Sequence, residues 1–177
     1  MRRWVALLRA VNLGSTNKVA MADLRALVES LGYEDVRTHL QSGNAVLSTG
    51  AITAAKLEQQ LESSIAAELG VACKVLVRTG PQMAAVVEHN PFIAKGRDPK
   101  ELHVAFLSSS PTAKRRAEVD PAQYEPDEFA FGDKAVYMRL ANGVQGSRLP
   151  NWERVLGVTA TGRSWKTVTR LHELVRG

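Results

Sequence analysis

Hydrophobic residues in the first half of the chain switch between strand-like and helix-like spacing. Residues 4–8 form a continuous apolar run of strand length, and residues 10–18 follow with the glycine, asparagine and serine content of a loop. Apolar residues at helical spacing over 21–31 then predict a helix that ends at Gly32. Short apolar runs at 36–40 and 45–47 predict two strands, joined by the turn residues 41–44.

A second helix and a further strand complete this half. Leu57, Leu61, Ile65 and Leu69 repeat every four residues, which predicts an amphipathic helix over 54–69 with Gly70 after its end. Residues 71–77 read as a closing strand. Residues 1–79 therefore have the order β-α-β-β-α-β, which is the split βαβ order of the ferredoxin-like fold.

The second half of the chain echoes this order without clear sequence repetition. A short helix over 82–88 and an irregular linker at 90–99 precede a strand at 102–107 and a charged helix at 111–118. Residues 128–131 and 135–140 predict a hairpin about Gly132-Asp133, and helices are expected at 149–156 and 165–175. The predicted fold class is α+β, with two ferredoxin-like halves, the second incomplete and followed by two C-terminal helices. The expected domains are 1–79, a connecting helix and linker at 80–100, and 101–177.

Composition places the chain among ordinary globular proteins, with 177 residues, 45% hydrophobic and 23% charged. The single cysteine, Cys73, excludes an intrachain disulfide and a Cys-x-x-Cys metal site. The apolar run near the N-terminus is cut short by Arg9, unlike that of a signal peptide, and no stretch is long enough to cross a bilayer. We therefore expect a cytoplasmic protein with no membrane partner, no metal and no cofactor.

Positive charge is concentrated near the C-terminus. Residues 147–177 carry six Lys or Arg and two Glu, a net charge of +4, whereas residues 1–146 carry +1. Within this segment, Arg163 and Lys166 flank Ser164, which we take as the N-cap of a helix with Trp165 on its buried face. Cations oppose the dipole at a helix start, so an anionic ligand or a nearby carboxylate is expected to balance them. A solvated basic face is the alternative interpretation.

A second group of polar residues is predicted from topology. In the split βαβ order the loop after the first strand and the turn between the next two strands emerge at the same edge of the sheet. Amides, hydroxyls and an ammonium group gathered there beside a helix start suit a phosphate or carboxylate. Residues 14–18 lack the second glycine and the Lys-Ser/Thr ending of a P-loop. The alternative is that these side chains only make turns and caps.

Signatures of enzyme chemistry are poor. The four histidines lie at no metal-ligand spacing, and no nucleophile elbow marks a catalytic triad. We interpret the adjacent Asp127 and Glu128 as solvated charges and Cys73 as an inert core thiol in a strand. The predicted central strands offer only Trp4 as an aromatic, which argues against an RRM-type RNA platform. Whether the protein is an enzyme stays open.

Three separated blocks of sequence resemble a known bacterial family. The blocks at 7–14, 17–25 and 41–44, together with the C-terminal segments 147–149, 156–161 and 163–168, are similar to those of the domain of unknown function 1697 (DUF1697). Ala10 stands where that family commonly has Gly, and Ser164 stands where it tends to have Asn, another good N-cap. The resemblance implies a two-part α+β protein of cytoplasmic bacterial type and implies no activity.

These observations favour a binding protein. The loop at 12–18, the turn at 41–44 and the helix start at 163–166 are expected to form one cleft for a small anionic ligand, phosphate- or carboxylate-bearing. One alternative is nucleic-acid association through the basic C-terminal surface, and another is an uncharacterised enzyme in which Lys18 or Arg163 stabilises an oxyanion in the same cleft. The oligomeric state is left open. The candidate ligand-binding residues are Arg9, Asn12, Ser15, Asn17, Lys18, Gln41, Ser42, Asn44, Arg163, Ser164, Trp165 and Lys166.

Overall fold

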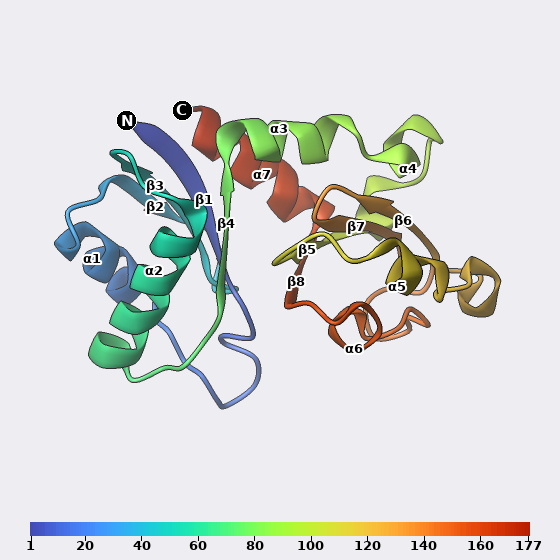
Figure 1. Ribbon diagram of the computed structural model, residues 1–177, viewed down its shortest axis with the longest axis horizontal. Coiled ribbons are helices and arrows are strands. Elements are labelled where there is room, and N and C mark those ends of the chain that lie inside the picture. The colour runs from blue at the N-terminus through green and yellow to red at the C-terminus, as the bar shows by residue number, and fades with distance from the viewer. The chain divides into compact units, whose positions relative to one another are not determined.

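The computed structural model describes residues 1–177 as two compact units. The first unit comprises Met1–Ala84 and Arg170–Gly177, and the second comprises Ala85–Thr169. Two helices run from one unit into the other, α3 (Gly80–Glu88) and α7 (Trp165–Arg176). Figure 1 follows the chain through both units.

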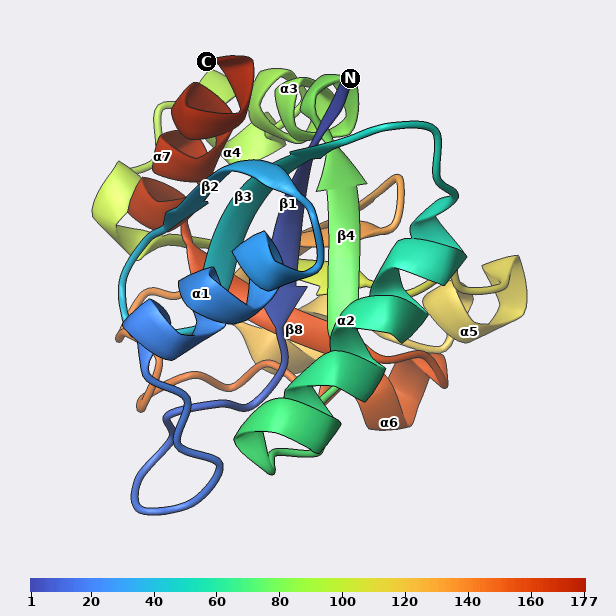
Figure 2. The same ribbon diagram turned by 90° about the vertical axis from the view of Figure 1, so that its left-hand side faces the viewer.

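The first unit is a four-stranded antiparallel sheet with helices on one face. Its strands are β1 (Arg2–Leu8), β2 (Glu34–Thr38), β3 (Asn44–Thr49) and β4 (Val75–Thr79), in the order β2-β3-β1-β4. Both β1 and β2 pair antiparallel with β3, so they run parallel to each other, which confirms the predicted arrangement. The helices α1 (Met21–Ser30) and α2 (Ala54–Leu69) lie across the sheet in Figure 2.

Apolar side chains of both helices build one core against this face of the sheet. Leu24 and Val28 of α1 and Leu57, Leu61 and Ile65 of α2 are each no more than 1% exposed. They pack with alternate residues of the central strand, namely Trp4, Ala6 and Leu8. The four-residue repeat of α2 thus faces the sheet as expected, between a Thr53 side-chain cap and Gly70 in the left-handed conformation.

The open edge of β4 is closed by two glutamates of α2. Glu62 Oε1 accepts a hydrogen bond from the Val75 N–H at 2.9 Å, and Glu58 Oε1 accepts one from the Val77 N–H at 3.0 Å. The spacing of four on the helix matches the spacing of two on the strand, because each step advances both elements by about 6 Å. An edge strand that would otherwise present free N–H groups is therefore covered by its own helix.

The second unit contains a second antiparallel sheet of four strands. Its strands are β5 (Leu102–Leu107), β6 (Glu128–Gly132), β7 (Ala135–Arg139) and β8 (Ala160–Ser164), in the order β6-β7-β5-β8. Its other elements are α4 (Pro91–Ala94), η1 (Pro99–Glu101), α5 (Ala113–Ala117), η2 (Pro121–Tyr124) and α6 (Trp152–Leu156). Trp152 of α6 packs edge-to-face with Phe129 and Phe131 of β6, at ring distances of 5.2 and 6.1 Å.

The strand β8 corrects the prediction that the second half is incomplete. Residues 160–164 have no apolar alternation and contain Gly162, so the pattern gives no strand signal. They nevertheless pair with β5 over their whole length, from Leu107 opposite Ala160 to His103 opposite Ser164. Thr161 and Arg163, rather than apolar residues, form the buried positions. The helix expected at 149–156 is also shorter, because Asn151 caps it and α6 begins at Trp152.

Both units use the same means of covering an edge strand. Glu153 of α6 accepts a hydrogen bond from the Ala160 N–H of β8 at 2.9 Å, as Glu62 of α2 does from Val75 of β4. In each unit the helix that carries the accepting carboxylate directly precedes the edge strand in the chain. The two sheets therefore share a strand order and a contact that covers one edge strand.

Replacement of Glu58 by Ala is expected to destabilise the protein by about 1–3 kcal/mol, because the buried Val77 N–H loses its acceptor. Urea unfolding followed by circular dichroism measures the change. Glu58→Gln keeps a side-chain oxygen that can accept from the Val77 N–H, so it is expected to lose less stability. Gln59→Ala, an exposed neighbour, controls for helix propensity. Equal stability of Glu58→Ala and Gln59→Ala would show that this contact contributes nothing.

Candidate functional site

The loop after β1 is held by one side chain, that of Asn12. Its Nδ2 donates to the Val19 carbonyl at 2.8 Å and to the Gln41 carbonyl, and its Oδ1 accepts from the Val19 N–H at 2.8 Å. The Asn12 N–H also donates to the Asn17 carbonyl at 3.0 Å. Asn12 therefore closes the 12–19 loop and joins it to the 41–44 turn, as the topology predicted for these two segments.

The backbone of this loop and turn is strained. Ala10, Asn12, Asn17 and Leu40 have positive φ angles between 51° and 58°. Asparagine tolerates this region, whereas it costs Ala10 and Leu40 about 1–2 kcal/mol each. Residues held in such conformations cluster at binding and catalytic sites, because the surrounding structure must impose them. Because four non-glycine residues with positive φ angles lie close together here, the loop and turn are a candidate functional site.

The turn itself is fixed from inside. Asn44 is fully buried and its Nδ2 donates to the His39 carbonyl at 2.8 Å and to Ser42 Oγ at 2.9 Å. Gly43 has a φ of 82°, and a Cβ there would lie 2.6 Å from Val11 Cγ2 and 2.8 Å from Leu8 Cβ. Glycine is therefore required for the turn to approach the start of the loop.

Between the loop and the turn lies a shallow depression of about 330 Å³. Lys18 and Gln41 supply its exposed polar side chains, and Asn12, Val19 and Ala20 complete the lining. Its lining contains one cation and no carboxylate. Ser15 lies exposed in the loop outside this lining, and Asn44 is enclosed in the turn. The structure thus brings Asn12, Lys18 and Gln41 together and gives Asn12 and Asn44 positioning roles.

A larger pocket of about 440 Å³ is lined by other residues of the same loop. Sequence reasoning found two of its residues, Arg9 and Asn17, but missed those that α2 and the approach to β4 contribute. The sequence indicates only that Glu62 and Ser63 lie on α2 beside its apolar stripe, and this position alone does not predict a pocket. The pocket is lined by Arg9, Ala10, Asn17, Glu62, Ser63, Ala66, Ala72, Cys73 and Lys74.

Cys73 is not in a strand, because β4 begins only at Val75. The side chain is half-buried, and this burial, together with the charge of Glu62, raises the pKa of the Cys73 thiol to about 11. Since the thiolate is the reactive form, Cys73 is a poor nucleophile at neutral pH. The interpretation of an inert thiol fits this pKa.

The residues 163–166 belong to the second unit and to two different elements. Arg163 lies in β8 rather than at a helix start, which corrects the sequence interpretation, and it is 7% exposed. Its guanidinium donates to Thr161 Oγ1 at 2.7 Å and to the Gly162 carbonyl at 2.9 Å, and burial lowers its pKa to about 10. Two groups of β8 itself thus accept hydrogen bonds from the guanidinium that was expected to face a ligand.

The helix that follows begins as predicted. Ser164 Oγ accepts from the Thr167 N–H at 3.3 Å, which confirms Ser164 as the cap of α7. Trp165 is buried and Lys166 is exposed on the first turn. The inclusion of these residues in one cleft with the loop and turn stays a prediction.

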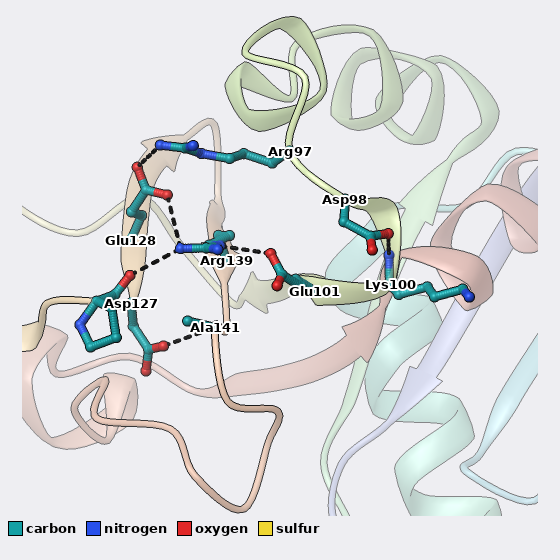
Figure 3. Close-up of polar contacts among 9 residues, drawn as sticks. Arg97, Asp98, Lys100, Glu101, Asp127, Glu128, Arg139 and Ala141 are labelled. Atoms are coloured by element: carbon teal, nitrogen blue, oxygen red, sulfur yellow. Dashed lines mark hydrogen bonds and ion pairs between the residues drawn. The ribbon is translucent and has the colours of Figure 1, made fainter.

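A polar network in the second unit corrects the interpretation of Asp127 as a solvated charge (Figure 3). Asp127 is 2% exposed, and its carboxylate accepts from the Ala141 N–H at 2.9 Å and from the Arg148 N–H at 2.7 Å. Sequence reasoning missed this because two backbone donors, far along the chain, replace water around the carboxylate. Asp127 anchors the segment that follows β7.

Glu128 belongs to a chain of ion pairs beside Asp127. Arg97 contacts its Oε1 at 2.9 Å and Arg139 lies 3.7 Å from its Oε2, while Arg139 also contacts Glu101 at 2.8 Å. The hydrogen bond that Arg139 donates to the Glu101 carboxylate raises the pKa of Arg139. The two positive and two negative charges of this network neutralise each other. The network therefore stabilises the fold and needs no ligand to compensate its charge.

The structure presents neither a metal-binding cluster nor a membrane-spanning helix. No group of three or more His, Cys, Asp or Glu residues is arranged to hold a metal ion. None of the helices combines the length and the apolar character needed to cross a membrane.

The sequence matches the family described as Protein of unknown function (DUF1697) over residues 1–137. Among solved structures, a conserved bacterial protein, SP0830 from Streptococcus pneumoniae, superposes with a TM-score of 0.75 at 22% sequence identity, covering 98% of each chain. No curated protein matches the sequence. At this identity the likeness shows a shared fold.

Replacement of Asn12 by Ala is expected to cost about 1–2 kcal/mol, because a half-exposed side chain with three hydrogen bonds is removed. Asn12→Asp is expected to cost as much, since a carboxylate oxygen would then face two carbonyl oxygens. Urea unfolding and amide exchange at Val19 measure both effects. Ser15→Ala, at the exposed part of the loop, should leave both unchanged. A wild-type rate of amide exchange at Val19 in Asn12→Ala would contradict the role of Asn12 in closing the loop.

Replacement of Ala10 by Gly is expected to stabilise the protein by about 0.5 kcal/mol. Removal of the Cβ relieves the left-handed conformation at Ala10, and the gain exceeds the added entropy of the unfolded chain. The matched control is Ala26→Gly, at an exposed helical position of α1, which should lose about 1 kcal/mol. Thermal unfolding of the two variants should move the midpoint in opposite directions, and equal losses would refute strain at Ala10.

Proposed function

Because the chain belongs to the family of proteins of unknown function described as DUF1697, we propose its function from its own residues. It is a binding protein for a small ligand that carries a phosphate or carboxylate group. The ligand binds in the depression between the 12–18 loop and the 41–44 turn. The proposal rests on one observation above all, that the lining of this depression carries the Lys18 ammonium and no carboxylate.

Different residues hold the loop in place and line the depression, which supports ligand binding rather than turn formation alone. Asn12 uses its amide to hold the loop against the turn, so it positions the site without contacting the ligand. Lys18 and Gln41 have exposed side chains in the lining, and they are the groups that would contact an anionic oxygen. A loop held in place before the ligand arrives loses less entropy on binding.

Nucleic-acid association through the C-terminal segment is the weaker alternative. Arg163 is buried in β8, and Arg170 pairs with Glu173 at 3.0 Å, so fewer cations of this segment are open to phosphates than the sequence suggests. Enzyme activity at the loop is a further alternative, with Lys18 stabilising an oxyanion. No nucleophile or general base stands in the lining beside Lys18, which favours binding.

We also propose that the two units are related ferredoxin-like folds. The order β2-β3-β1-β4 in the first unit corresponds to β6-β7-β5-β8 in the second, strand by strand. The edge-strand glutamates Glu62 and Glu153 occupy equivalent places in this correspondence.

Inorganic phosphate and acetate, titrated at constant ionic strength, are the probes for the proposed site. At least one is expected to raise the melting temperature with saturation, because a ligand that prefers the folded state stabilises it by mass action. Lys18→Ala should abolish this effect, whereas Lys56→Ala, an exposed lysine of α2, should retain it. Equal responses of both variants would reject Lys18 as the anion contact, and a linear salt-like response would reject the site.

A further inference from the structure

Two large apolar side chains lie exposed next to the depression that contains Lys18. Leu13 is 66% exposed and Leu40 is 58% exposed, and in the first unit Met1 is the one other exposed large hydrophobic residue. Leu13 directly follows Asn12 and Leu40 directly precedes Gln41, and both of these neighbours line the depression. Consecutive Cα atoms are about 3.8 Å apart, so both leucines are close to any ligand that extends out of the depression.

The backbone at Leu40 indicates that this side chain does not serve the fold. Its φ angle of 58° lies in the left-handed region, which is unfavourable for leucine and open to glycine and asparagine. A side chain that is mostly exposed gains little from packing, so burial does not offset the unfavourable backbone. Residues held in such conformations are typical of binding sites.

Hydrogen bonds fix the backbone beside each leucine. The His39 N–H donates to the Asn44 carbonyl at 3.1 Å, and Asn44 Nδ2 donates to the His39 carbonyl at 2.8 Å, which closes the turn around Leu40. Asn12 closes the loop that carries Leu13 and joins it to the turn. In Figures 1 and 2 the loop after β1 projects beyond the end of the sheet. Both leucines are therefore held in place at an open part of the first unit.

The depression itself combines one cation with apolar surface. Its volume of about 330 Å³ is at the lower end of the range of small-molecule sites, roughly 300–1,000 Å³. Val19 and Ala20 line it together with the exposed Lys18. A small ion that contacts the Lys18 ammonium would leave Leu13 and Leu40 in water. A longer ligand would cover them.

We propose that the ligand of this site is an amphipathic anion, a phosphate or carboxylate attached to an aliphatic chain. The anionic group contacts Lys18, and the chain extends out of the depression against Leu13 and Leu40. This ligand class rests on the proposed function, because it specifies which anions the same depression prefers. Each methylene that becomes buried strengthens binding by up to about fourfold, which inorganic phosphate and acetate do not gain.

Two homologous series test the proposal on the full-length protein at constant ionic strength. One series is acetate, butanoate and hexanoate, and the other is inorganic phosphate, butyl phosphate and hexyl phosphate. In at least one series the Kd, measured by NMR titration of amide signals, is expected to fall about tenfold or more from the shortest to the longest member. Equal Kd values along both series would overturn the amphipathic ligand and leave the proposed function standing. Absence of binding by every member would overturn both.

Substitution of the leucines locates the chain of the ligand. Leu40→Asn should fold, because asparagine tolerates a left-handed backbone. It should weaken binding of the longest member at least fivefold and change the Kd of the shortest member less than twofold, and Leu13→Asn should do the same. The matched control is Val144→Asn, at a 64% exposed position of the second unit, which should bind like wild type. Wild-type affinity of both leucine variants for the longest member would exclude the contact, and so would an equal loss for both members.

Lys18→Ala tests the anionic contact separately. This variant should lose affinity for every member of the series. If it kept the dependence on chain length and the affinity of wild type, the anion would not contact Lys18, and the proposed function would be overturned along with the ligand class.

Two other occupants of the leucine surface are tested directly. Cosedimentation uses vesicles of phosphatidylcholine and phosphatidylglycerol, and light scattering measures the mass of the protein in solution. Sedimentation with vesicles that Leu40→Asn abolishes, in a protein that binds no monomeric chain, would assign the leucines to a membrane surface. A dimer that Leu40→Asn dissociates would assign them to a second copy of the chain. Either result would overturn the proposal.

Discussion

The contact between the glutamates of α2 and the open edge of β4 is the constraint on which the first unit depends. Glu58 and Glu62 supply the acceptors that an edge strand lacks on its outer side, and in doing so they fix the helix in register with the strand. The apolar stripe of α2 alone would tolerate small shifts along the sheet, since hydrophobic burial is non-directional. The hydrogen bonds from two N–H groups of β4 do not allow such shifts, because the length and angle of a hydrogen bond are narrowly defined.

The same contact gives the first unit its second pocket. Glu62 is both the partner of the Val75 N–H and a charged group in the lining, so the fold determines where its second oxygen lies. The opposite side is formed by the loop after β1, which Asn12 closes. Each wall of this pocket is thus fixed by an interaction that serves the fold.

Much of the fold could be predicted from the sequence, and the exceptions have physical reasons. The order of elements in residues 1–79 followed from hydrophobic periodicity, and the nearness of Asn12 to Gln41 followed from the parallel relation of β1 and β2. The strand β8 was missed because its buried residues, Thr161 and Arg163, are polar and give no hydrophobic alternation. Asp127 was misread because its partners, the Ala141 and Arg148 N–H groups, come from a distant segment.

The sequence predicts some residues of the loop and of the neighbouring pocket but not others. Asn12 was found, although for binding rather than for the positioning role that its three hydrogen bonds give it. Glu62 and Lys74 were not found, because their pairing depends on how α2 lies against β4, and periodicity fixes only which face is buried. Periodic patterns define the core, whereas a binding site forms where elements that are distant in sequence end close together. In this chain the positive φ angles of Ala10 and Asn17 occur where distant segments meet, since both residues line the pocket that Glu62 also lines.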